Sequence, residues 1–256
     1  RGALQKQVGD LDAYLASLNM CLTIQPFDEG SEYRAYVDGK PRLDGVRSFL
    51  RARGITLPEG DATDPPEAMT VHGLARRKDG LFERRLRQHG VETFASTIAL
   101  IEGLRRRGVK TGLVTSSRHG REIVDAAGIG RLFDARLDGV DIDERGLAGK
   151  PNPDMFVKCA EALGAAPDRA IVVEDALAGV QAGRRGGFGL VVGVDRGGNG
   201  GALARAGADV VVTDLAELDP DRLDARVRSR QEELAWDVEA EGFDPAREHA
   251  MERLFV

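Results

Sequence analysis

The sequence predicts an α/β protein, a doubly wound parallel sheet with a small all-helical cap domain. Strand-like and helical segments alternate through residues 91–219 at intervals of about 20 residues, which is typical of such a sheet. The run Ala170–Val173 is apolar and rich in β-branched residues, as expected of a strand buried on both faces. Residues 28–90 show a helical pattern instead, and we predict that they form the cap.

The strand predicted at Ala170–Val173 runs directly into two adjacent carboxylates, Glu174 and Asp175. Open α/β sheets bind their ligands at the carboxyl ends of the strands. Two hard oxygen ligands on rigid backbone suit Mg²⁺ and a phosphate. The alternative is that both residues start the next helix, with Asp175 as its N-cap.

Residues 1–27 are predicted to be the N-terminal part of the core, a degenerate or incomplete first strand. Asp10 and Asp12 have the D-x-D spacing that places two side chains on one side of an extended strand. One would then act as nucleophile and the other as general acid/base. The alternative is that this common spacing is a coincidence on a helix.

The remaining elements follow in order. In the cap, two prolines in the loop 61–67 interrupt the helical pattern. In the core, residues 91–219, glycines such as Gly108 mark helix ends. The predicted helices are Thr97–Arg107, Glu122–Ala127, Pro153–Leu163, Gly179–Arg185 and Ala202–Ala206, and the predicted strands are Val109–Val114, Phe133–Val140, Ala170–Val173, Gly189–Val194 and Asp209–Thr213. Residues 220–256 do not continue this alternation of strands and helices, and we predict that they form a linker and tail.

Composition excludes several classes of function. Acidic and basic residues are mixed and the net charge is −6, so we expect neither a nucleic acid partner nor a membrane surface. Cys21 and Cys159 lack metal-site spacing and lie among apolar residues, which favours small core residues in a reducing cytoplasm. The sequence has no apolar run long enough for a membrane span and no apolar signal core, so we expect a cytoplasmic protein.

Two further groups could take part in chemistry. Thr115 ends a predicted strand, where its hydroxyl could donate a hydrogen bond to a phosphoryl oxygen, and Ser116 and Ser117 follow it. Lys150 lies in the stiff loop Gly149–Pro153, where an ammonium group could neutralise a transferring phosphoryl group. The alternatives are a helix-capping run of hydroxyls and a solvated loop lysine.

Taken in this order, these residues resemble the haloacid dehalogenase superfamily of phosphatases and phosphomutases. The resemblance covers roughly residues 28–215 and is strongest in Gly149–Phe156 (GKPNPDMF) and Val172–Ala182 (VVEDALAGVQA). It implies a Rossmann-like core, an aspartyl-phosphate on the first strand, and Mg²⁺ bridging the nucleophile and the acidic pair. The implied metal ligands are Asp10, Asp12, Glu174 and Asp175.

Within the superfamily the chain looks like the β-phosphoglucomutase group. The segments Asp38–Arg42 and Leu74–Lys78 resemble cap segments that bind the distal phosphate of a sugar bisphosphate. By position, the binding residues would be Arg42 and Lys78, with Ser116 and Ser117 also on the substrate. A mutase holds two phosphates at once, whereas a phosphatase needs one. The alternative is that both residues are ordinary exposed cations on helices and bind no substrate.

The tail, Trp236–Val256, resembles the opening of glycoside hydrolase family 65 disaccharide phosphorylases. Those enzymes release β-glucose 1-phosphate, the substrate of β-phosphoglucomutase. A disaccharide phosphorylase domain in the same pathway is therefore an expected partner, besides the phosphorylated sugar. The protein itself is expected to be a monomer or dimer.

The first motif departs from the family pattern, because Asp12 is followed by Ala13 and not by glycine, and no strongly apolar run precedes Asp10. Two hypotheses follow. The chain is a Mg²⁺-dependent phosphomutase or sugar phosphatase that works through Asp10 and Asp12. Alternatively, it is a catalytically impaired domain that still binds a sugar phosphate.

Overall fold

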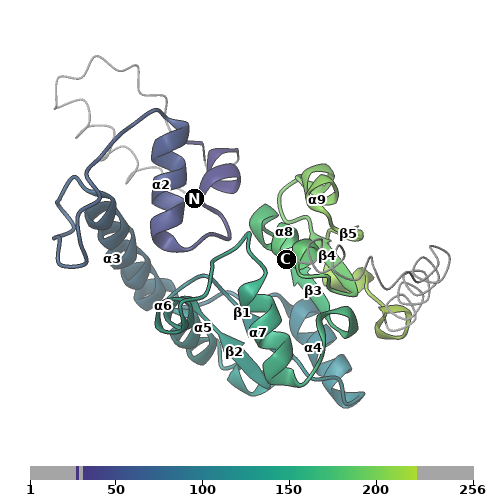
Figure 1. Ribbon diagram of the computed structural model, residues 1–256. Coiled ribbons are helices and arrows are strands. Elements are labelled where there is room, and N and C mark those ends of the chain that lie inside the picture. The colour runs from purple at the N-terminus through teal and green to yellow at the C-terminus, as the bar shows by residue number, and fades with distance from the viewer. Residues whose placement is uncertain (1–26, 29–30, 224–256) are drawn as a thin grey trace, which may run out of the picture. The chain divides into compact units, whose positions relative to one another are not determined.

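The computed structural model describes residues 27–28 and 31–223 (Figure 1). The chain divides into two compact units, Arg1–Arg84 and Arg85–Val256. This division lies a few residues before the boundary at residue 90 that the sequence suggested. The predicted first strand in residues 1–27 and most of the predicted tail lie outside the described residues.

The smaller unit is helical in its described part, as the sequence pattern predicted. It contains the π-helix η1 (Tyr33–Val37), α2 (Arg42–Ala52) and the larger part of α3 (Val71–His89). Helix α2 packs closely on η1, because a Cβ atom at Gly45 would lie 3.3 Å from Val37 Cγ1. Phe27 and Phe49 add an edge-to-face ring pair with centroids 5.2 Å apart.

Helix α3 is the longest described helix, with 19 residues. Its sequence, VHGLARRKDGLFERRLRQH, buries Val71 and Ala75 but is rich in arginine beyond that first part. No helix in the described ranges is both long and apolar enough to cross a membrane.

The larger unit alternates strands and helices, as predicted. Its strands are β1 (Gly112–Val114), β2 (Ala135–Leu137), β3 (Ile171–Glu174), β4 (Leu190–Val194) and β5 (Val210–Val212). Its α-helices are α4 (Ala95–Arg106), α5 (Gly120–Ala126), α6 (Gly139–Arg145), α7 (Asp154–Leu163), α8 (Leu177–Arg185) and α9 (Gly200–Ala206). Short 3₁₀ turns lie at η2 (Gly130–Leu132), η3 (Pro167–Arg169) and η4 (Leu215–Glu217).

Every described strand pair is parallel, which confirms the predicted fold class. Strand β1 pairs with β2 from Gly112 opposite Ala135, and β3, β4 and β5 form a second sheet in that order. Within the described ranges, β1 hydrogen-bonds only to β2, and β3 only to β4. Val114 of β1 nevertheless packs on the apolar cluster that contains Val172 of β3, so one core joins the two sheets.

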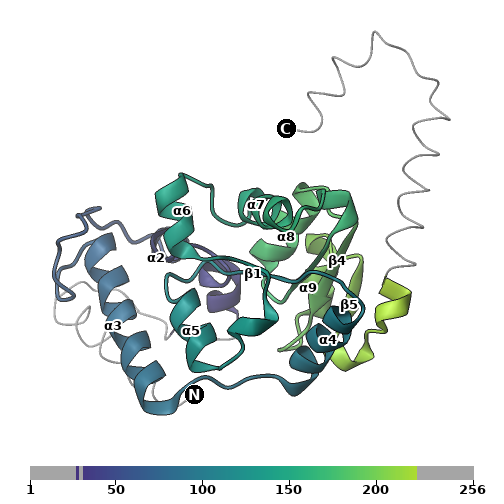
Figure 2. The same ribbon diagram turned by 90° about the horizontal axis from the view of Figure 1, so that it is seen from below.

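Helices cover both faces of the three-stranded sheet (Figures 1 and 2). On one face, Val172 and Val191 pack with Phe156 of α7, Val180 of α8 and Leu203 of α9. On the other face, a separate cluster brings Leu100 of α4 against the sheet. That second cluster comprises Leu190, Val192, Val194, Val212, Leu215 and Leu223. The core is therefore doubly wound, as the sequence predicted.

Strand β4 lies at the centre of this sheet, and all five of its residues are buried. Alternate side chains supply the two opposite clusters, because successive residues of a strand point to opposite faces. Each fully buried valine or leucine contributes about 1.5–3 kcal/mol of hydrophobic stabilisation. The continuous apolar sequence LVVGV is what a strand covered on both faces requires.

The predicted strand Phe133–Val140 is wrong at its carboxyl end, because β2 stops at Leu137 and α6 starts at Gly139. Asp138 forms a capping box: its carboxylate accepts from Val140 N at 2.9 Å, while Asp141 Oδ2 accepts from Asp138 N at 2.9 Å. This local capping starts a helix where the apolar spacing suggested a strand.

Cys159 is a buried core residue, as predicted. It packs with Leu137, Ile142 and Met155 beneath the two-stranded sheet. Burial raises the pKa of the Cys159 thiol to about 11, so the thiol stays protonated at neutral pH. Cys21 lies outside the described residues.

Gly112 of β1 allows α7, the helix that carries Cys159, to approach the strand closely. A Cβ atom at Gly112 would lie 2.4 Å from Cys159 Sγ and 3.2 Å from Leu163 Cδ1. We predict that Gly112→Ala destabilises the protein by about 1–3 kcal/mol through overpacking. Urea denaturation measures the change.

The matched control is Gly103→Ala in α4, where an added Cβ would meet nothing closer than 3.8 Å. That variant should be about 0.5–1 kcal/mol more stable than the wild type, because glycine disfavours helix. Equal effects of the two substitutions would contradict the close packing at Gly112.

Candidate active site

The candidate site residues of the larger unit follow the ends of two strands. Thr115 comes directly after β1, Glu174 is the last residue of β3, and Asp175 follows it. Lys150 lies in the loop between α6 and α7. The sequence predicted all four, and the structure shows what each contacts.

Lys150 and Glu174 form a buried ion pair. The Lys150 ammonium lies 3.2 Å from both carboxylate oxygens of Glu174, and the two side chains are only 4% and 13% exposed. The ring of Phe156 lies beneath the ammonium, with its centroid 4.7 Å from Nζ. Lys150 is thus enclosed by an anion and an aromatic face. The alternative of a solvated loop lysine is wrong.

The loop that carries Lys150 is held at both ends. Asn152 N and Nδ2 both donate to Gly149 O, at 3.0 and 3.1 Å, which closes a tight turn around the lysine. Asp154, in the first turn of α7, accepts from Ala148 N at 2.9 Å. These bonds reduce the entropy cost of placing a long side chain at the end of β3.

Asp175 differs from Glu174 in its surroundings. Its side chain is 52% exposed, and Oδ2 lies 3.3 Å from Nε of Arg196, a residue the sequence reasoning missed. Helix α8 has Ala176 as N-cap and no side-chain capping bond, so Asp175 does not cap it. The alternative interpretation of Asp175 as an N-cap is therefore wrong, and its carboxylate instead contacts Arg196.

Gly179 explains part of the motif VVEDALAGVQA. A Cβ atom at this position would lie 2.2 Å from the carboxyl carbon and from Oε1 of Glu174. The first turn of α8 therefore runs directly against the carboxylate, and only glycine leaves room for it. The sequence contains an indication of this close approach. Glycine lowers helix propensity, so a glycine inside a helix indicates that the position needs a residue without a side chain.

The hydroxyl run Thr115–Ser117 shapes the loop between β1 and α5. Thr115 N donates to Leu137 O at 3.0 Å, and Thr115 Oγ1 accepts from Ser117 N at 3.1 Å. Ser117 Oγ in turn accepts from His119 N at 3.2 Å. His119 is the N-cap of α5 without a capping side-chain bond, so the hydroxyls order the loop and do not cap the helix directly.

In the smaller unit, the structure brings together the two cations predicted to bind substrate. Arg42 Nη1 lies 2.5 Å from Asp79 Oδ2, and Lys78 lies over the ring of Tyr33. Desolvation of its ammonium group and, next, the Arg42 guanidinium lower the pKa of Lys78, although much of the residue is exposed. A lysine whose charge interacts with a nearby arginine suits an anionic ligand better than two unrelated surface cations would.

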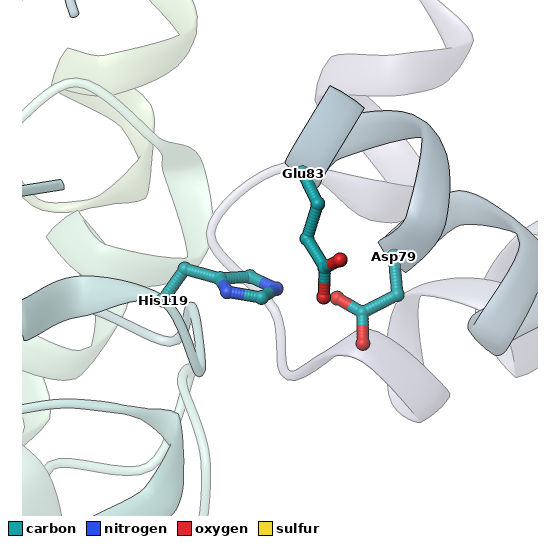
Figure 3. A group of neighbouring side chains, drawn as sticks. All are labelled: Asp79, Glu83 and His119. Carbon is teal, nitrogen blue, oxygen red and sulfur yellow. The ribbon is translucent and has the colours of Figure 1, made fainter. Parts of the chain in front are cut away.

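Asp79 and Glu83 project from the same side of α3, one turn apart (Figure 3). Asp79 supplies the counter-charge for Arg42 at the start of α2. His119, the third labelled residue of Figure 3, belongs to the larger unit, where its Nδ1 lies 2.8 Å from Glu122 Oε2.

Asp10 and Asp12 lie outside the described residues, and their roles stay predictions. Arg196 could have been found from the sequence, because it follows the apolar run of β4 by two residues, at the same strand edge as Asp175. Composition gave no reason to single out one arginine among many.

A parallel α/β sheet with adjacent carboxylates at one strand end, one of them paired with a buried lysine, is an arrangement suited to an enzyme of the phosphoryl-transfer class. The chain belongs to the haloacid dehalogenase-like hydrolase family, whose family model matches residues 21–187. Within this family it groups with the β-phosphoglucomutases. Enzymes of this superfamily generally use Mg²⁺.

The chain is similar to the following proteins, of which the first supports this placement. A protein of Mycobacterium bovis named β-phosphoglucomutase is 47% identical over 196 residues, which is 75% of each chain. An uncharacterized glycosyl hydrolase of Mycobacterium tuberculosis is 40% identical over 185 residues, 72% of this chain and 14% of that protein. The crystal structure of a β-phosphoglucomutase from Clostridium difficile has the same fold, with a TM-score of 0.64 and 19% identity over 89% of this chain and 88% of that one.

Removing the ammonium of Lys150 should be costly, because it leaves the mostly buried carboxylate of Glu174 without this cation. We predict that Lys150→Met destabilises the protein by about 3 kcal/mol. Glu174→Gln added to Lys150→Met should restore part of that loss, with a coupling energy of about 1–3 kcal/mol in the double-mutant cycle. Denaturant unfolding of all four proteins measures it.

The control is Lys158→Met, which breaks the exposed pair of Lys158 with Glu161 and should cost less than about 0.5 kcal/mol. A coupling energy near zero between residues 150 and 174 would mean that the buried pair makes no special contribution to folding.

Gly179→Ala should displace the side chain of Glu174 without replacing any ionisable residue, because the added methyl group occupies the space of the carboxylate. We predict that phosphoryl-transfer activity falls by roughly 10–100-fold, as for other changes that disturb a metal ligand from outside. The measurement is turnover beside thermal unfolding. Gly201→Ala in α9, where the nearest atom to a Cβ is 3.5 Å away, is the matched control. Full activity of Gly179→Ala would contradict a site at Glu174.

Proposed function

We propose that the protein is a Mg²⁺-dependent phosphoryl-transfer enzyme that acts as a β-phosphoglucomutase, converting β-glucose 1-phosphate to glucose 6-phosphate. The observation that carries the proposal is the buried Lys150–Glu174 pair beside the exposed carboxylate of Asp175 at the end of β3. The 47% identity to a named β-phosphoglucomutase over three quarters of both chains supports the substrate.

The donor set fits Mg²⁺. Glu174 and Asp175 offer carboxylate oxygens on adjacent residues of rigid backbone, and Mg²⁺ prefers such hard oxygen ligands. When bound, the ion would neutralise charge on the transferring phosphoryl group. Asp10 and Asp12 would complete the ligand set, as the family resemblance implies.

Lys150 would stabilise the same charge from the protein side. An ammonium group has three donors, and the contacts to Glu174 engage its two carboxylate oxygens, so a donor remains for a phosphoryl oxygen. The pair with Glu174 and the ring of Phe156 hold the ammonium in place before substrate arrives, which limits reorganisation during the reaction. Thr115 would add a hydroxyl donor to the phosphoryl group, with Ser116 and Ser117 beside it.

Arg42 and Lys78 are proposed to bind the distal phosphate of a sugar bisphosphate. The salt bridge to Asp79 holds the Arg42 guanidinium, and its proximity to Lys78 creates a positive site suited to a dianion. A second phosphate site favours a mutase, because both phosphates of the intermediate bisphosphate must be bound.

The covalent step is assigned to Asp10 by resemblance alone. Its carboxylate would attack the 1-phosphate of bound glucose 1,6-bisphosphate to form an aspartyl-phosphate, and Asp12 would protonate the departing O1, so that glucose 6-phosphate is released. The phosphoryl group would then pass from Asp10 to the 6-hydroxyl of β-glucose 1-phosphate, which regenerates the bisphosphate. A sugar-phosphate phosphatase differs only in that water accepts the phosphoryl group.

The protein is proposed to work in the cytoplasm, as a monomer or dimer, downstream of a disaccharide phosphorylase. The similarity of this chain to 14% of a longer protein named as an uncharacterized glycosyl hydrolase is consistent with this proposal. The resemblance of residues 236–256 to a phosphorylase points the same way.

The test is a coupled assay of the full chain with Mg²⁺, β-glucose 1-phosphate and a trace of glucose 1,6-bisphosphate. We predict glucose 6-phosphate without free phosphate, and complete loss with EDTA. Asp175→Asn should lower kcat by about 100-fold or more, because it removes a metal-binding charge. Asp143→Asn, which alters an exposed carboxylate on α6, should leave the rate unchanged.

Free phosphate in place of glucose 6-phosphate would identify a phosphatase. Binding of glucose 6-phosphate without any turnover by the folded protein would identify a sugar-phosphate-binding domain and overturn the proposed activity.

A further inference from the structure

Arg196 lies in the loop after β4 and has two unusual contacts within the larger unit. Its Nε lies 3.3 Å from Asp175 Oδ2, and its guanidinium carbon lies 3.7 Å from the centroid of the Phe94 ring. A guanidinium stacked so closely on an aromatic face is fixed in orientation as well as in position.

Phe94 is otherwise hard to explain. It is the N-cap residue of α4 and is 53% exposed, although a large apolar ring at a helix start contributes neither a capping bond nor core packing. Its stack with Arg196 gives the ring a partner. The two residues come from segments about a hundred positions apart in the sequence, so tertiary structure alone brings them together.

The backbone that carries Arg196 is also held in place. Asp195 accepts hydrogen bonds from the amides of Gly197, Asn199 and Gly200 at 3.1, 2.8 and 2.9 Å, which fix the turn into α9. The arginine is therefore held by its backbone, its ring partner and the carboxylate of Asp175.

We propose that Arg196 is a positioning residue for the metal site: stacked on Phe94, it holds one oxygen of Asp175 and leaves the other oriented for the cation. The contact joins Nε to Oδ2 at 3.3 Å, and the Asp175 side chain is still 52% exposed, so the arginine can restrain the carboxylate while leaving it accessible to a cation. This inference rests on the proposed function, which assigns Asp175 to the metal.

The direction of the effect on metal affinity separates positioning from simple electrostatics. A fixed positive charge beside a metal ligand repels a divalent cation, so removing that charge should tighten binding if nothing else changes. If Arg196 orients Asp175, its removal frees an exposed side chain, and binding weakens in spite of the lost repulsion. Lysine at this position keeps the charge but loses the planar stack.

The experiment is a titration of the full chain with Mn²⁺, followed by electron paramagnetic resonance of the free ion. Arg196→Met, Arg196→Lys and Phe94→Leu are each expected to weaken Mn²⁺ binding, the arginine variants by roughly 10-fold as for other residues that orient a ligand from outside. Arg184→Met, which breaks the ion pair with Asp209 elsewhere on the sheet, should leave affinity unchanged. Thermal unfolding of every variant checks that the fold is intact.

Tighter or unchanged binding in Arg196→Met, with Asp175→Asn still abolishing it, would overturn the inference while leaving the proposed function in place. Wild-type affinity in Arg196→Lys would likewise overturn it, because charge alone would then suffice. Equal weak binding by wild type and Asp175→Asn would overturn the metal assignment itself, and the inference with it.

Discussion

The buried contact between Lys150 and Glu174 is the interaction on which the candidate site depends. It ties the loop before α7 to the end of β3, at a point where neither side chain has much access to water. Burying two charges is favourable only when each is satisfied, and here the carboxylate meets an ammonium while the ammonium also meets an aromatic face. Gly179 then allows α8 to close over the same carboxylate.

The two adjacent carboxylates of the candidate site, Glu174 and Asp175, lie in different environments. Glu174 is enclosed and neutralised by lysine, whereas Asp175 is half exposed and restrained by Arg196 from the side. Both carboxylates are proposed Mg²⁺ ligands, and they differ in what holds them in place: the ion pair with Lys150 fixes Glu174, whereas Asp175 stays accessible to solvent. In the smaller unit, Arg42 and Asp79 form a comparable pair, in which a carboxylate holds a cation that we propose to bind an anionic ligand.

Several features were within reach of the sequence because they depend on local patterns. The apolar run at β4 and the carboxylates at the end of β3 identified the sheet and the edge at which the candidate site lies. The strand expected through Val140 failed for an equally local reason, because a capping box at Asp138 started a helix that apolar spacing does not reveal. Asp10 and Asp12 remain predictions, since they lie outside the described residues.

By itself, the sequence determined the fold class, the family and the residue types of the candidate site, because periodicity and motif spacing act over a few residues. Only tertiary structure decided which partner each side chain has. Lys150 became a buried counter-ion of a residue 24 positions away, and Phe94 and Arg196 met across two segments of the larger unit. Such contacts depend on how helices pack against the sheet, and burial, which sets the strength of every charge interaction, exists only once that packing is complete.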